Sequence, residues 1–242
     1  MYTPNTSKGD ASVSLSERGT RNGRRQELLV PCDFCHEFNG GADSAFHHLY
    51  KGRLDSRIVM ASPNFVVIPS IGQLNEGHLL ILPATHKLSL GQLDGAERLE
   101  FEALKDRVRF VVTSLYSDPI CFEHGCITEG GGCGVYHAHL HVVPVAAELP
   151  GVRKRLAREF HEHPVVSCDL LATRIAAGRP YLFFETRAGQ GYMYEVDALP
   201  SQFMRRLVSE ELGHSQWDWT GAGFEESLVR VAARLEAVGS RV

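Results

Sequence analysis

The sequence lacks any long hydrophobic run. Its apolar stretches all fall short of the roughly 20 residues that a membrane-spanning helix needs, so we expect no transmembrane segment. The N-terminal region also lacks the apolar core of a secretory signal peptide. Both absences suit a cytoplasmic protein of one large or two small globular domains, at a length of 242 residues of which 43% are hydrophobic.

Neither sign of charge is in large excess. The 25 lysines and arginines nearly balance the 29 aspartates and glutamates, which leaves a formal net charge of −4. This balance gives no bulk electrostatic attraction to nucleic acid or to an anionic membrane. We therefore predict neither of them as a partner.

Cysteines are few, and without a signal peptide we expect reduced thiols or metal ligands and not a disulfide framework. The six cysteines are Cys32, Cys35, Cys121, Cys126, Cys133 and Cys168. The first two have the Cys-x-x-Cys spacing that supplies half of many structural zinc sites. Redox pairs and chance share this spacing, so the pair alone leaves the choice open.

Large apolar residues are nearly missing from residues 1–27, which are rich in serine, glycine, threonine and arginine. Such a segment cannot bury enough surface to fold, so we predict a disordered polar tail. A transit peptide is the alternative interpretation of its mildly basic composition.

The chain that follows predicts an α+β domain over residues 28–149. Residues 57–69 predict two strands around a Ser-Pro-Asn turn, and residues 79–82 predict an apolar strand. Apolar residues at helical spacing over residues 94–116 predict a long amphipathic helix. With further strands near residue 120 and over residues 137–143, the order of elements predicts an antiparallel sheet with the helix on one face.

Residues 150–242 predict a C-terminal α/β extension. Residues 181–196 predict a hairpin, and residues 202–212 and 223–238 predict two helices. No linker composition separates the extension from the preceding domain, so we expect the two to pack together.

Three histidines alternate with apolar residues in His137-Ala138-His139-Leu140-His141. Side chains of a strand alternate between its faces, so the histidines would share one face while their neighbours point into a core. Each imidazole brings an extra ring nitrogen that must find a partner, which makes three in a row costly in a core. This face is a candidate site with a nucleophile, proton carrier or metal ligand, and a low-complexity metal-binding tract is the alternative.

These motifs together resemble the histidine triad (HIT) family of nucleotidyl hydrolases and transferases. The segment over residues 137–143 is similar to the family signature His-φ-His-φ-His-φ-φ, where φ is apolar. The Gly-His-Leu-Leu-Ile-Leu-Pro-Ala-Thr-His segment at residues 77–86 resembles the second family motif. Cys-Asp-Phe-Cys at residues 32–35 resembles the opening of zinc-bearing members, and the resemblance spans roughly residues 30–147.

The resemblance implies roles for individual residues. His139 would be the nucleophile, and His141 would bind or protonate the phosphate. His78 would line the same pocket, with packing at a strand end as the alternative. The implied ligands of a structural zinc are Cys32, Cys35, His86 and His137. His36 and Cys133 are competing ligands.

The chain departs from the family at the substrate site. Gly132-Cys133 stands where many relatives have Gly-Gln, Glu123 replaces an asparagine, and no acid stands at Ser70, where relatives bind ribose. The predicted substrate contacts are His124, Cys133, Gly134 and Arg205. A solvated arginine face is the alternative for Arg205. Trp217 and Trp219 could stack on a base or be buried in a small core.

These observations favour an enzyme that acts on a nucleoside phosphoanhydride or phosphoramidate through a nucleotidyl-histidine intermediate. Its partner would be a nucleotide or a nucleotidyl conjugate, and the resemblance adds a homodimer as an expectation. One alternative is a non-catalytic zinc-stabilised binding protein. Another is an enzyme that uses the histidines as ligands of a catalytic metal.

Overall fold

The computed structural model describes residues 32–41, 43–128, 135–165, 167–221 and 225–239. They belong to a unit that spans residues 31–242. The predicted tail at residues 1–27 lies outside the described residues, and so do the predicted substrate contacts Cys133 and Gly134.

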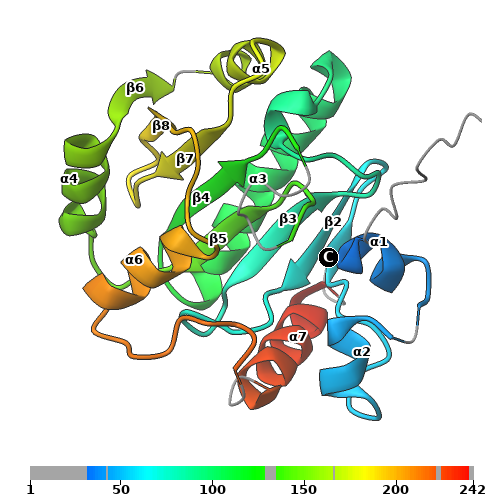
Figure 1. Cartoon of the computed structure of the whole chain (residues 1–242). Helices are drawn as coiled ribbons and strands as arrows, with labels where there is room; N and C mark the ends of the chain where they lie inside the picture. The colour runs from blue at the N-terminus through cyan, green and yellow to red at the C-terminus, as the bar shows by residue number, and fades with distance from the viewer. Residues whose placement is uncertain (1–31, 42, 129–134, 166, 222–224, 240–242) are drawn as a thin grey trace, which may run out of the picture. The chain divides into compact units, whose positions relative to one another are not determined.

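An eight-stranded sheet organises the described chain, with the strand order β1-β2-β3-β5-β4-β7-β8-β6 (Figure 1). The strands are β1 (Met60–Ala61), β2 (Phe65–Pro69), β3 (Leu79–Pro83), β4 (Pro119–Gly125), β5 (Leu140–Pro144), β6 (His161–Val165), β7 (Tyr181–Glu185) and β8 (Gly191–Glu195). Every neighbouring pair is antiparallel.

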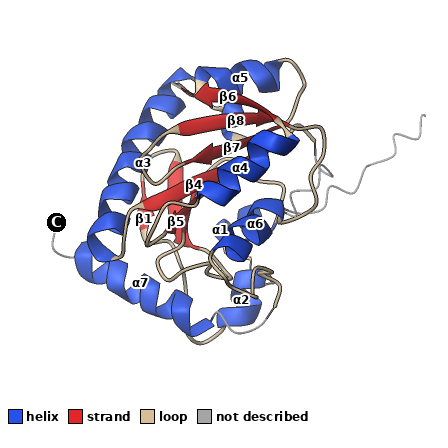
Figure 2. Ribbon diagram, turned by 90° about the vertical axis from the view of Figure 1, so that its left-hand side faces the viewer, coloured by secondary structure: helices blue, strands red, loops and turns tan. Residues whose placement is uncertain are grey.

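Helices lie on both faces of this sheet (Figure 2). They are α1 (Asp33–Phe38), α2 (Ala45–Tyr50), α3 (Gly95–Leu115), α4 (Pro150–Glu159), α5 (Asp169–Ala176), α6 (Phe203–Glu211) and α7 (Glu225–Gly239). Helix α3 begins with a capping box, in which Asp94 and Glu97 each accept the backbone N–H of the other. The long helix on one face of an antiparallel sheet confirms the predicted α+β fold.

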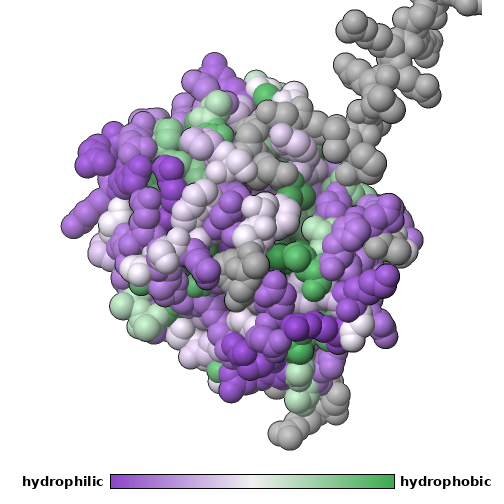
Figure 3. All heavy atoms as spheres, turned by 60° about the horizontal axis from the view of Figure 1, so that its bottom comes forward, coloured by the Kyte–Doolittle hydropathy of each residue, from purple (hydrophilic) through white to green (hydrophobic). Residues whose placement is uncertain are grey.

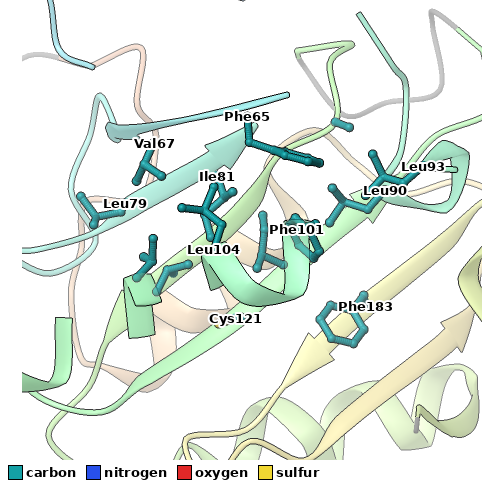
Figure 4. Packing of buried hydrophobic residues seen from close by; sticks show 14 of the residues in the cluster. Phe65, Val67, Leu79, Ile81, Leu90, Leu93, Phe101, Leu104, Cys121 and Phe183 are labelled. Atoms are coloured by element: carbon teal, nitrogen blue, oxygen red, sulfur yellow. The ribbon is translucent and has the colours of Figure 1, made fainter. Parts of the chain in front are cut away.

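Two hydrophobic cores fill the space between sheet and helices. The core beneath α3 contains Phe101 and Leu104 of the helix and Ile81 and Cys121 of the sheet (Figure 4). The core on the opposite face joins β4, β5, β7 and β8 to α4 and α6. Helix α1 lies on this second face, where Phe34 packs on β2 and β3. The face opposite α3 is therefore shared by the N-terminal helix and the C-terminal extension.

The extension continues the sheet of the preceding domain. Strand β7 pairs with β4 from Cys121↔Glu185 to Gly125↔Tyr181. The predicted hairpin and the two predicted helices correspond to β7–β8, α6 and α7, whereas α4, β6 and α5 were not predicted. The division of the chain into domains stays a prediction.

One face of the molecule is mostly polar. On the face shown in Figure 3, hydrophilic residues predominate and hydrophobic residues gather only in small groups. Within the part of the chain that the structure describes, no helix combines the length and the apolar character needed to cross a membrane.

Candidate functional site

The three histidines of the His-Ala-His-Leu-His segment lie where the chain enters β5, on the sheet face opposite α3. The residues between them pack in the core beneath α3, as the alternating pattern predicts. The rings of His139 and His141 meet with centroids 4.9 Å apart. Phe34 of α1 lies against both His137 and His139, with ring centroids 5.8 Å apart in each case. Helix α1 thus packs directly on the triad.

His78 and His141 form a buried pair whose protons can be assigned. The backbone N–H of Leu74 donates to His78 Nδ1 at 3.3 Å, so a neutral His78 carries its proton on Nε2. His78 Nε2 then donates to His141 Nδ1 at 2.9 Å, which leaves the proton of a neutral His141 on Nε2. Burial lowers the pKa of both imidazoles well below the usual value. His141 is therefore a neutral donor, and His78 orients it.

Acidification is expected to destabilise the fold through this pair. Burial lowers both pKa values well below 6.5. Below about pH 6 the two histidines are therefore protonated in the unfolded chain but stay neutral in the folded protein. The contribution of the pair to stability is complete above about pH 7 and is lost as the pH falls, at about 1.4 kcal/mol per pH unit and proton. His78→Gln removes one of these protons.

The measurement is the slope of the unfolding free energy against pH between about pH 5 and pH 6, from denaturant titrations. We expect a slope smaller by about 1.4 kcal/mol per pH unit in His78→Gln than in the unsubstituted protein. Equal slopes would show that His78 titrates alike in the folded and unfolded states.

One ring nitrogen of His139 is hydrogen-bonded, and the other has no hydrogen-bond partner among the described residues. Its Nδ1 donates to the backbone carbonyl of His137 at 2.5 Å, which assigns the proton to Nδ1. Burial lowers the pKa of the His139 imidazole and the nearby charge of Arg205 lowers it further, although the hydrogen bond to His137 opposes them. The ring is therefore neutral near pH 7, with an unprotonated Nε2.

A pocket opens beside His139 and His141. Its polar lining residues are Asp33, Arg57, Ser70, His139, His141 and Arg205. Its apolar lining residues are Phe34, Ile71, Leu80, Val135 and Trp219. Three parts of the chain that are distant in sequence therefore meet here: α1, the central strands and the C-terminal extension.

Arg205 brings a buried positive charge to this pocket from α6. Its side chain donates to Trp217 O at 2.9 Å from Nε and to Gly72 O at 2.6 Å from Nη2, and the residue is 4% exposed. Burial lowers its pKa to about 10, so the guanidinium stays charged at pH 7. No carboxylate among the described residues lies within ion-pair distance of it. The charge is available to an anion, whereas Arg206 lies 3.6 Å from Glu210 on the surface.

Glu123 lies on the α3 side of β4, away from the histidines. Its carboxylate accepts the N–H of Leu90 at 2.7 Å and the O–H of Tyr181 at 2.5 Å, and burial raises its pKa to about 7. It does not repel a phosphate in the pocket. His124 points to the opposite face, where burial, followed by the charge of His139, lowers its pKa to about 4.

The four predicted metal ligands come together. Donor atoms of Cys32, Cys35, His86 and His137 all lie within 4.8 Å of one another. The Nδ1 atom of His137 lies 3.3 Å and 3.5 Å from the two sulfur atoms, and that of His86 lies 3.4 Å from Cys35 Sγ. A tetrahedral zinc with bonds of about 2.3 Å to sulfur and 2.0 Å to nitrogen sets these atoms about 3.5 Å apart. The cluster therefore fits a metal with four protein ligands.

A hydrogen bond to the backbone fixes the His137 tautomer that a metal ligand needs. His137 Nε2 donates to Pro83 O at 2.9 Å, which leaves the lone pair of Nδ1 directed at the sulfur atoms. Burial lowers the pKa of His137 to about 4, so the ring is neutral, as a metal ligand must be.

The competing ligand His36 and the described cysteines Cys121, Cys126 and Cys168 lie outside this cluster. The other competing ligand, Cys133, lies outside the described residues. His36 Nε2 is 3.3 Å from a carboxylate oxygen of Asp43. Cys121 and Cys168 are free, as expected for reduced thiols. Cys126 is disulfide-bonded, so the expectation of reduced thiols does not extend to it.

Two charged pocket residues were missed by sequence reasoning. Arg57 makes a two-point ion pair with Glu37, at 2.8 Å and 2.7 Å, and donates to Pro69 O at 3.0 Å. Asp33 accepts the N–H of Ala45 at 3.0 Å. Arg57 stands alone before a strand and Asp33 lies in the Cys-x-x-Cys spacer, so neither carries a pattern that marks it. The charge of Arg57 is paired directly with a carboxylate, whereas Arg205 has no carboxylate of the described residues within ion-pair distance.

Comparison of the sequence with known families assigns the chain. Residues 20–157, more than half of its length, match the family described as "Protein similar to CwfJ C-terminal". The chain belongs to this family. The segment that matches the CwfJ C-terminal family contains the metal cluster and the triad, whereas Arg205 and Trp219 lie beyond it. No curated protein matches the chain.

Solved structures of HIT proteins are similar to about half of this member of the CwfJ C-terminal family. A zinc-bound HIT family protein from Mycobacterium smegmatis is 22% identical over 47% of this chain and 74% of its own, with a TM-score of 0.36. HIT family proteins from Bacillus anthracis and Bacillus subtilis are each 18% identical, with TM-scores of 0.38 and 0.37. These alignments cover 49% and 47% of this chain and 75% and 72% of the Bacillus chains.

Proposed function

We propose that this protein is a nucleotidyl hydrolase or transferase that acts on a nucleoside phosphoanhydride or phosphoramidate. The observation that carries the proposal is the state of His139. Its Nδ1 is held by the backbone of His137, its ring is neutral, and it lines a pocket that also contains the buried cation Arg205. A neutral nucleophile beside a buried positive charge that no carboxylate of the described residues contacts suits attack on an anionic phosphorus centre.

The reaction has two steps. The Nε2 lone pair of His139 forms a bond to phosphorus, the bond from phosphorus to the leaving group breaks, and the nucleotide is held as a phosphoramidate. Water or another acceptor then forms a bond to phosphorus as the bond from phosphorus to His139 Nε2 breaks. The proton of the acceptor passes through solvent to the departed leaving group, and His139 keeps its original proton on Nδ1. The backbone carbonyl of His137 stabilises the cationic imidazole that forms in the first step, because it accepts the Nδ1–H throughout.

Two side chains would bind the phosphate. The Nε2–H of His141 donates to a non-bridging oxygen, and His78 keeps that proton in place through its bond to His141 Nδ1. Arg205, which lines the same pocket, would neutralise the phosphate charge. His124 on the same sheet face is a third phosphate contact in this proposal. It would take over the phosphate contact that other polar side chains make in the HIT family.

The metal in this proposal is a structural zinc. Cys32, Cys35, His86 and His137 supply four donors, which leaves no open coordination position for substrate. Zinc bound there would stabilise the attachment of α1 to β3 and to the segment before β5, and would thereby hold Phe34 against the triad.

Intact mass spectrometry tests the proposed intermediate. The protein is mixed with a panel of nucleoside phosphoanhydrides and phosphoramidates and denatured at alkaline pH, where phosphohistidine persists. We expect a nucleotidyl adduct that maps to His139 and is absent from His139→Asn. Turnover without any adduct, or an adduct on another residue, would contradict the covalent route through His139.

A further inference from the structure

Both tryptophans of the chain, Trp217 and Trp219, lie in the segment that joins α6 to α7 (Figure 1). Trp217 packs against the core beneath α4 and α6. Trp219 is half-buried and lines the pocket of His139 together with Phe34 and Ile71. This segment lies outside the part of the chain that matches a known family.

Gln202 has a strained backbone conformation, and its side chain holds the segment that contains the tryptophans. Within the described ranges, Gln202 is the one residue other than glycine with a positive φ, at 59°. Its amide nitrogen donates to Asp218 Oδ1 at 2.8 Å, and its amide oxygen accepts the N–H of Trp219 at 3.2 Å. A left-handed non-glycine residue persists only where its surroundings hold it, and such residues cluster at ligand sites.

A second contact with the same segment comes from the loop after β2. Gly72 follows β2 with a φ of +69°, and a Cβ atom there would lie 2.7 Å from Trp219 Cα and 2.9 Å from Arg205 Nη2. The backbone of the loop after β2 therefore touches Trp219 directly. Together with Gln202, this contact sets where the indole of Trp219 meets the pocket.

We propose that Trp219 contacts the substrate by stacking on its nucleobase, and that Gln202 is the residue that positions it. This inference rests on the proposed nucleotide function. The polar groups around His139 suit a phosphate, whereas Phe34, Ile71 and Leu80 supply an apolar wall beside Trp219. A planar base fits such a wall, because every base has an aromatic face that an indole can cover. The C-terminal extension thus supplies both a phosphate contact, Arg205, and a base contact.

Intrinsic fluorescence tests this assignment directly. In a Trp217→Phe background, Trp219 is the sole tryptophan, and adenosine 5′-monophosphate is titrated against ribose 5-phosphate, which has the phosphate and sugar but no base. We expect the nucleotide to quench Trp219 and ribose 5-phosphate to leave its emission nearly unchanged. Trp219→Leu should weaken binding of the nucleotide about 10-fold or more. Its affinity for ribose 5-phosphate, measured by calorimetry, should stay the same.

The positioning role of Gln202 has its own test. Glycine adopts the observed φ without strain, so Gln202→Gly keeps the backbone and removes both amide contacts. We expect KM for a nucleotide substrate to rise several-fold with kcat within about twofold of the original value, since binding is lost and the reacting groups stay in place. Lower thermal stability with unchanged KM would show a purely structural role and overturn the assignment.

Two glycines give a matched pair of variants that tests the contact between Gly72 and Trp219. Gly72→Ala and Gly213→Ala impose the same backbone penalty, since their φ values are +69° and +73°, but only at Gly72 does a Cβ meet another residue within 4 Å. We expect Gly72→Ala to shift the emission of Trp219 and weaken nucleotide binding, and Gly213→Ala to do neither. Equal behaviour of the two variants would show that the contact between Gly72 and Trp219 does not position the indole.

The outcomes separate this inference from the proposed function. Quenching of Trp219 by the nucleotide in a protein that forms no adduct supports stacking and rejects the covalent mechanism. Adduct formation with equal nucleotide affinity in Trp219→Leu supports the mechanism and overturns the stacking.

Discussion

Replacement of His139 by asparagine is expected to reduce turnover of a nucleotide phosphoramidate by about 10⁴-fold or more. The asparagine amide can still donate to the carbonyl of His137, but it offers no lone pair that can attack phosphorus. Single-turnover rates measure the effect, and circular dichroism together with metal content verifies the fold. Both should match the unsubstituted protein, because His139 is not among the four clustered metal ligands.

His137→Asn is the matched control, two residues earlier on the same face. We expect it to lose metal, thermal stability and activity together, since His137 Nδ1 lies 3.3 Å and 3.5 Å from the sulfur atoms of the cluster. If His139→Asn alone loses metal, the nucleophile and the ligand have been assigned in reverse. If both variants turn over at the original rate, the triad has no catalytic role.

The sequence predicted what depends on local pattern. Alternation over residues 137–141 identified one polar and one buried face, and the core beneath α3 contains the intervening residues. Helical spacing over residues 94–116 predicted α3, which runs from Gly95 to Leu115. The family motifs predicted four ligands from three separate segments, and their donor atoms meet within 4.8 Å.

Pairing between distant strands could not be predicted in this way. Strand β7 extends the sheet because it pairs with β4, and residues such as Phe122 and Phe184 are far apart in sequence. The alternation of polar and apolar residues along a strand does not indicate which other strand it pairs with. The same limit applies to Glu123, whose side chain can be placed only after its neighbours show which face of β4 meets the histidines.

The burial of Arg205 could not be predicted from the sequence either. In the sequence, Arg205 and Arg206 are adjacent cations on one predicted helix. Position on the helix separates them: Arg205 is 4% exposed against Gly72, and Arg206 turns toward Glu210. The family resemblance offered no help either, because it ends before the extension. Burial of a cation is decided by tertiary neighbours, and these come from a loop that lies 133 residues away.

Removal of the metal is expected to lower the melting temperature by more than about 10 °C, because structural zinc contributes apparent binding free energies of roughly 10–16 kcal/mol that are lost on unfolding. Cys35→Ser should show the same loss with metal content near zero. Cys168→Ser is the control, since Cys168 is a free, half-buried thiol outside the cluster. Differential scanning calorimetry with and without a chelator measures both effects.

The order of losses during chelation distinguishes the two roles that a metal could have. A structural zinc would hold α1, and Phe34 of α1 packs on His139 with ring centroids 5.8 Å apart. Activity should therefore decline together with stability. Restored zinc should return both to the unsubstituted apo-protein but not to Cys35→Ser, which lacks one of the four donors. A catalytic metal would instead abolish turnover while the melting temperature stays within a few degrees. Metal-free protein that melts at the original temperature would exclude the structural role, because all four donors would then be dispensable to the fold that they connect.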